Sequence, residues 1–294
     1  MRIIGALIGR NLKLYFRDRA LVLYSLMSVF IIIALYALFL GNTMVESIQQ
    51  HAAAKAGVRF LTDSWLMSGL ILVNAVNVPL IMLNTMVVDR WSGRLRDFTT
   101  SPIRRGCLGA GYLISSWVTG ILMELLTIIL AEFYIVARGG EWLSPPRLIG
   151  AVLAASLCVA AYSCVFFFIT LFFESPGAFS ALCTVVGTLI GFLGGIYIPI
   201  GSLPDYVQRV MQWIPVTHSA ALLRDIFVAA PMDALFHGAP QTIRDSTARE
   251  FGIQVSFQGH ALSDGWLVGI TLLTGAVFLA LSLLKMAHMH KKEL

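Results

Sequence analysis

Few residues in this chain have the type and spacing that chemistry in a protein requires. Glu124 is a carboxylate within a long apolar run, and Asn74, Asn77 and Asn84 place amides in another. A charged side chain at mid-membrane costs about 2.5–3.5 kcal/mol on insertion scales, and an amide in apolar surroundings is costly unless it is hydrogen-bonded. Each is therefore predicted to meet a partner or a hydrated cavity. For Glu124 this means a polar contact in a transport path or a structural bond between helices.

The motifs of common catalytic centres are absent from the sequence. No Lys follows a Gly, so there is no phosphate-binding loop of the GxxxxGK[ST] type, and there is no HExxH or GxSxG. The four cysteines form no CxxC pair and are expected to be small packing residues. The sequence therefore predicts no catalytic residue, no metal site and no cofactor bound by this chain.

The elements that must position the polar residues are runs without any charge. Soluble domains are about 25% charged, whereas this chain is 13% charged and 57% hydrophobic. Roughly 20 residues of helix cross a bilayer, and the alternating segments of a membrane barrel are missing. The sequence predicts an all-α membrane protein with six transmembrane helices in one domain (1–294). The uncharged runs are 20–45, 64–88, 106–123, 148–173, 175–204 and 265–284.

The Lys and Arg residues predict the orientation of these spans. Six spans place both termini on one side, and that side carries 13 of the 21 Lys and Arg residues in its shorter segments. The positive-inside rule then places both termini in the cytoplasm. The same bias explains the net charge of +5, so no nucleic-acid partner is needed to account for it.

Residues 1–19 are predicted to form an amphipathic helix before the first span. Its basic face suits the anionic headgroups of the inner leaflet, with the apolar face toward lipid. The alternative is a plain cytoplasmic extension of the first span. The expected apolar face is Ile4, Leu7, Ile8, Leu12 and Tyr15, and the basic face is Arg10, Lys13 and Arg17.

Two further segments stand out between the spans. The loop 89–105 is densely charged and too short for a domain, and Ser101-Pro102 has the order of an N-cap followed by Pro at the first helical position. After the fifth span, which Pro199 is expected to end, residues 203–230 read as two short amphipathic helices that dip into the outer leaflet or cap the bundle. Residues 231–263 read as a polar outer loop with room for some strand.

Three segments together resemble the type-2 ABC exporter permeases. The first is the basic helix before the first span, and the second is VDRWSGRLRDFTTSPIRRGCLGAGYL, with an acidic-Arg-x-x-Gly stretch followed by a Ser/Thr-Pro step. The third and most specific is the order of elements after the fifth span, namely Pro199, Leu203-Pro204, Ile214-Pro215, His218 and Arg224. The resemblance covers nearly the whole chain.

The resemblance implies the following roles. Residues 1–19 would be an elbow helix, 203–230 re-entrant outer helices that close the exit, and 93–105 a coupling segment that docks on a separate ABC ATPase subunit carrying ATP and Mg²⁺. A second copy or a paralogous permease would complete a substrate path in the cytoplasmic membrane of a bacterium, with lipid around it. The coupling residues would be Arg94, Leu95, Arg96, Phe98, Ser101, Pro102 and Arg104.

The polar residues of the candidate path indicate which kind of substrate is transported. The candidate path residues, Asn74, Asn77, Asn84 and Glu124, are few and mostly uncharged, which favours export of a hydrophobic or amphipathic molecule such as a drug, an antibiotic or a lipid-like compound. The alternatives are a polysaccharide or lipid-linked glycan exporter, an ion-coupled carrier that depends on Glu124, and a membrane-embedded enzyme that acts on lipid.

Overall fold

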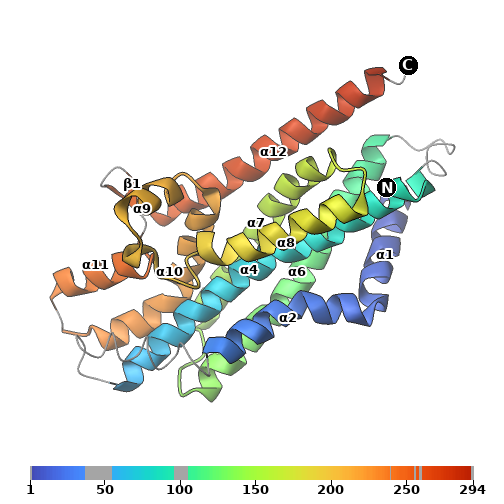
Figure 1. Cartoon of the computed structure of the whole chain (residues 1–294). Helices are drawn as coiled ribbons and strands as arrows, with labels where there is room; N and C mark the ends of the chain where they lie inside the picture. The colour runs from blue at the N-terminus through green and yellow to red at the C-terminus, as the bar shows by residue number, and fades with distance from the viewer. Residues whose placement is uncertain are drawn as a thin grey trace.

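The computed structural model describes residues 2–36, 55–95, 105–238, 240–254, 256–257 and 260–292. Its long helices run along one another as an elongated bundle, with the short N-terminal helix lying across one end (Figure 1). The predicted all-α class is confirmed. Within the described part, the only strands are the two-residue pair β1 (Ser256–Phe257) and β2 (His260–Ala261). The helices are α1 (Arg2–Arg17), α2 (Arg19–Leu35), α4 (Lys55–Trp91), α6 (Arg105–Ala137), α7 (Pro145–Thr170), α8 (Pro176–Leu193), η2 (Ile200–Ser202), α9 (Asp205–Met211), α10 (Pro215–Leu235), α11 (Gln241–Glu250) and α12 (Asp264–Lys292).

The structure supports five or six membrane spans, where six were predicted. Five helices of the described chain, α4, α6, α7, α8 and α12, are long and apolar enough to cross a bilayer, and α1 with α2 forms a sixth candidate bent by 75°. At the bend, the Asp18 side chain accepts a hydrogen bond from the Leu21 amide at 3.0 Å, which caps the first turn of α2. The chain thus enters α2 at a steep angle to α1.

Proline begins several helices, because its fixed φ suits the first turn, where no amide donor is needed. Pro145 and Pro146 open α7, and Pro176 opens α8. The predicted end of the fifth span at Pro199 is wrong. Helix α8 stops at Leu193, and Gly195 then adopts φ +65°, a left-handed conformation that favours glycine.

Helix α4 is the central element of the bundle, packed against α2, α6, α7, α8 and α10. It begins at Lys55, so the span predicted from the uncharged run 64–88 starts too late. Asp63 interrupts that run in the sequence, yet the residue is 1% exposed within the helix. Its carboxylate lies 3.9 Å from the Arg138 Nε, which offsets part of the cost of burying a charge.

The segment after α8 is more deeply packed than an ordinary loop. Helix α9 is short, as predicted, whereas α10 is a 21-residue helix whose residues 217–224 are all buried. It packs against α4, α7, α8 and α12. The predicted polar outer loop 231–263 contains the end of α10, then α11 and the β1–β2 pair.

Candidate functional site

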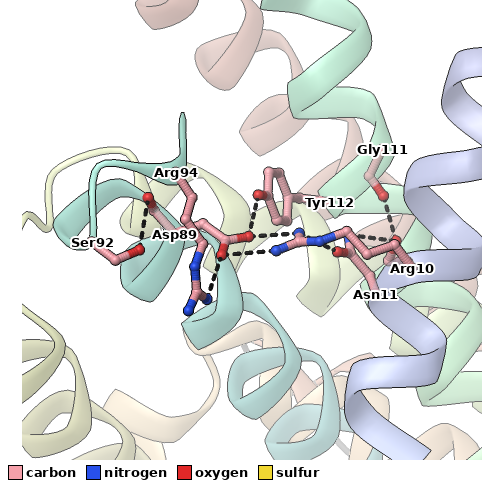
Figure 2. Close-up of polar contacts among 8 residues, drawn as sticks. Arg10, Asn11, Asp89, Ser92, Arg94, Gly111 and Tyr112 are labelled. Atoms are coloured by element: carbon pink, nitrogen blue, oxygen red, sulfur yellow. Dashed lines mark hydrogen bonds and ion pairs between the residues drawn. The ribbon is translucent and has the colours of Figure 1, made fainter. Parts of the chain in front are cut away.

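A group of polar residues joins three helices at the base of the charged loop. The Asp89 carboxylate is 1% exposed, near the end of α4. It accepts two hydrogen bonds from the Arg10 guanidinium of α1, at 2.7 and 2.9 Å, and one from the Tyr112 hydroxyl of α6 at 2.7 Å (Figure 2). Arg94, on the loop itself, lies 3.5 Å away. We call Arg10, Asp89, Arg94 and Tyr112 the Asp89 cluster.

The partners of the Asp89 cluster extend it along α1 and α6. The Arg10 guanidinium also donates to the Asn11 side-chain oxygen at 3.0 Å, and the Asn11 amide donates to the Ser115 hydroxyl at 3.1 Å. Ser115 in turn donates to the Gly111 carbonyl at 2.6 Å. A bidentate Arg–carboxylate pair fixes geometry as well as adding energy. The middle of α1, the end of α4 and the first turns of α6 are therefore held in one arrangement.

Arg90, the next residue along α4, joins the same point to a fourth helix. Its guanidinium donates to the Phe173 carbonyl at 2.7 Å and to the Thr170 carbonyl at 3.3 Å. Both carbonyls belong to the end of α7 and the short connection to α8, where backbone acceptors lack partners within the helix. Two consecutive residues before the loop therefore contact α1, α6 and the α7–α8 junction.

The prediction that the apolar face of α1 lies toward lipid is wrong for much of that face. Leu7, Asn11 and Tyr15, one turn apart from each other, are 5%, 0% and 1% exposed, and α1 packs against α6. A Cβ at Gly111 would lie only 3.0 Å from the Leu7 side chain, so the glycine favours this close approach. Arg10, predicted on the basic outer face, turns inward because Asp89 offers it a buried carboxylate.

Most of the predicted coupling residues lie outside the described residues, namely Arg96, Phe98, Ser101, Pro102 and Arg104. Of the two that are described, Arg94 is 60% exposed at its side chain and contacts Asp89, while Leu95 packs in part against the core of the bundle. Their docking role stays a prediction. The structure adds that the residues at the start of this loop, Asp89 and Arg90, are bonded to α1, to α6 and to the α7–α8 junction.

The predicted path residues do not come together within one subunit. Asn74 is fully buried and donates to the Thr127 hydroxyl of α6 at 2.6 Å, so it is a helix–helix contact. Asn77 is half-buried, and its oxygen lies 3.8 Å from the position of a Cβ on Gly187 of α8. The oxygen of half-buried Asn84 and both carboxyl oxygens of buried Glu124 have no hydrogen-bond partner among the described residues.

Arg224, on α10, is fully buried and makes no ion pair in the described chain. Its Nη2 donates to the carbonyls of Gly194 and Gly195, at 2.6 and 2.8 Å, at the end of α8, and Nη1 donates to the Gly252 carbonyl at 3.4 Å. The guanidinium also lies 5.0 Å from the centre of the Trp65 ring of α4. Helix C-termini favour a cation, so Arg224 joins α10, α8, α4 and the turn after α11.

The other predicted residues of this segment serve mainly the local backbone. Pro204 is the N-cap of α9, Pro215 is the first residue of α10, and Pro199 precedes the short 3-10 turn. His218 is 4% exposed, with Nδ1 3.1 Å from the Ile214 carbonyl. Helices α9 and α10 thus form a packed cap on the bundle, and Arg224 makes more polar contacts than the other predicted residues there.

Comparison with known proteins decides what kind of molecule this bundle is. A family model described as "ABC-2 family transporter protein" matches residues 44–284. The chain belongs to this family. Its members are transmembrane transport components, and the match includes both the charged loop and the cap formed by α9 and α10. A search of curated proteins returned no match. The Asp89 cluster is therefore part of a multi-pass transport permease.

Proposed function

We propose that this permease is the membrane subunit of an ATP-driven exporter, with both termini in the cytoplasm and ATP and Mg²⁺ bound by a separate ABC ATPase subunit. The observation that carries the proposal is the Asp89 cluster. A displacement of the loop 89–105 by a docked subunit would act directly on α1 and α6 through Asp89, and on the α7–α8 junction through Arg90. Such a rigid connection is what a shift between inward- and outward-facing states requires.

A second membrane subunit, either a copy of this chain or a paralogue, would cover the exposed face of α8. The exposed residues there are mostly small, so another helix could approach closely. The hydroxyls of Thr184 and Thr188 are bonded to carbonyls one turn earlier, at 3.1 and 2.9 Å, so burying them leaves no donor unpaired. The exposed set is Gly177, Ala178, Ser180, Ala181, Thr184, Val185, Thr188, Leu189 and Phe192.

In this proposal α1 is the elbow helix, and α9 and α10 are the re-entrant helices. The 75° bend between α1 and α2 suits an elbow helix along the inner surface of the membrane. The outer cap, with α10 packed into the bundle and held by Arg224, suits re-entrant helices that close the exit of the path. The cargo we propose is hydrophobic or amphipathic, because the candidate path offers amides and few charges.

The test is to purify the permease with the ATPase subunit that accompanies it and to measure ATP hydrolysis and transport together. We expect hydrolysis to be stimulated by hydrophobic or amphipathic compounds. Replacing Leu95 and Phe98 with Asp should abolish transport while the permease still folds. Assembly and transport that survive this double change would contradict the coupling assignment, and stimulation by anionic glycans alone would contradict the proposed cargo.

A further inference from the structure

The outward face of α1 carries basic residues that the Asp89 cluster does not use. Lys13 and Arg17 are exposed and lie one turn apart, so both side chains leave the same face of the helix. Helix α1 contains no acidic residue, and no hydrogen bond or ion pair joins either side chain to another described residue. This face therefore presents two cations to whatever lies beside it.

The surface beside these cations is open to solvent and is not an enclosed pocket. Ala6, Gly9, Arg10, Lys13, Leu14 and Arg17 line an open depression of about 470 Å³. A side chain added at Gly9 would meet nothing within 4 Å, so a ligand can approach the helix backbone there. Exposed apolar side chains flank the basic stripe, with Phe16 (41% exposed) on one edge and Ile3 and Leu14 (45% and 44%) on the other.

Charge, shape and flanking residues together fit one kind of ligand. We propose that Lys13 and Arg17 bind the phosphate of an anionic glycerophospholipid of the inner leaflet, with the headgroup in the depression over Gly9 and the acyl chains along Phe16, Ile3 and Leu14. The proposal rests on the orientation proposed above, because anionic lipids attract basic segments at the cytoplasmic surface. A membrane-surface helix with basic and apolar edges is the usual form of such a site.

The site would also act on the loop, because Arg10 belongs to both places. Arg10 lines the depression and holds Asp89 through two short hydrogen bonds. A bound lipid would fix α1 against the membrane and so favour the arrangement in which Arg10 reaches Asp89. Lipid composition is then expected to change the stability of the Asp89 cluster, and through it the response of the permease to its ATPase subunit.

The test measures lipid binding directly, without ATP or a partner subunit, so it is independent of the transport proposal. Purified permease in detergent is titrated with dioleoylphosphatidylglycerol or dioleoylphosphatidylcholine, and retained lipid is counted by native mass spectrometry. Each basic residue contributes about fivefold in affinity, so K13Q/R17Q should weaken phosphatidylglycerol binding roughly thirtyfold. The matched control R209Q/R249Q removes the same charge from exposed outer positions and should bind like the unmodified chain.

One more variant and one competition experiment complete the test. Gly9→Leu covers the helix backbone in the depression without changing charge, and it should weaken binding even if K13Q/R17Q fails to fold. Glycerol phosphate, which lacks acyl chains, should not displace the bound lipid. Equal binding by the control and K13Q/R17Q, equal binding of the two lipids, or full binding by Gly9→Leu would each overturn the proposal, as would displacement by glycerol phosphate.

Discussion

Replacing Asp89 with Asn keeps the shape of the side chain while removing its charge. The carboxylate accepts hydrogen bonds at 2.7 and 2.9 Å from Arg10 and at 2.7 Å from Tyr112. An amide has one acceptor oxygen, so its nitrogen would face a donor of Arg10 or Tyr112, and at least one of these bonds is lost. Breaking a buried charge pair costs about 3–5 kcal/mol, and the Arg10 side chain is 28% exposed, so we expect roughly 2–4 kcal/mol of destabilisation.

The assay is unfolding by sodium dodecyl sulfate in mixed micelles, with Asp89→Asn, Arg10→Gln and the double variant forming a cycle. Because the two side chains bond directly, the cycle should give an interaction energy of at least about 1 kcal/mol. Asp205→Asn, an exposed acid on α9, is the control and should stay within about 0.5 kcal/mol of the unmodified chain. Purely additive effects, or an Asp89→Asn variant as stable as the control, would refute the assigned role of the cluster.

Three other substitutions test separate parts of the structure. Gly111→Leu places a side chain against Leu7, and overpacking should lower the stability by about 1–3 kcal/mol, measured in the same unfolding assay. Arg224→Lys should lower the melting temperature, since an ammonium cannot reproduce the planar fork that reaches two carbonyls at the end of α8; an unchanged melting temperature would count against this role. Burial, and then the neighbouring Asp264 carboxylate, raise the pKa of Asp225, so the folded chain loses stability as pH rises through that pKa. Asp225→Asn should therefore melt higher than the unmodified chain at pH 7.5, and the difference should vanish near pH 4.

The positions of the spans could be predicted because the membrane requires long uncharged helices. Helix α6 begins within one residue of the uncharged run 106–123, although it continues past Glu124 to Ala137. The early start of α4 could not be predicted, because an acidic residue such as Asp63 is typical of a loop between spans. Its ion pair with Arg138, which allows it to be buried in the helix, is visible only in the structure. The end of α8 was placed at Pro199, the stronger breaker in sequence, whereas the chain turns at Gly195. In each case a contact or a backbone angle decided the boundary.

The Asp89 cluster was missed for a similar reason, although the sequence held one signal for it. Asn11 lies in the middle of the apolar face of α1, between Leu7 and Tyr15, where a lipid-facing helix would not place an amide. That position indicates a polar partner, which the structure identifies as Ser115. The pairing of Arg10 with Asp89 spans 79 residues of chain, and no local pattern predicts it.

The most direct test of the central claim is the number of cargo molecules moved per ATP hydrolysed. The permease is reconstituted with its ATPase subunit in proteoliposomes, with a fluorescent amphiphile that stimulates hydrolysis as the cargo. If the Asp89 cluster carries motion from the loop to the bundle, the Asp89→Asn complex should assemble and hydrolyse ATP but transport at least tenfold less per ATP than the Asp205→Asn control. An unchanged ratio of transport to hydrolysis would contradict the claim.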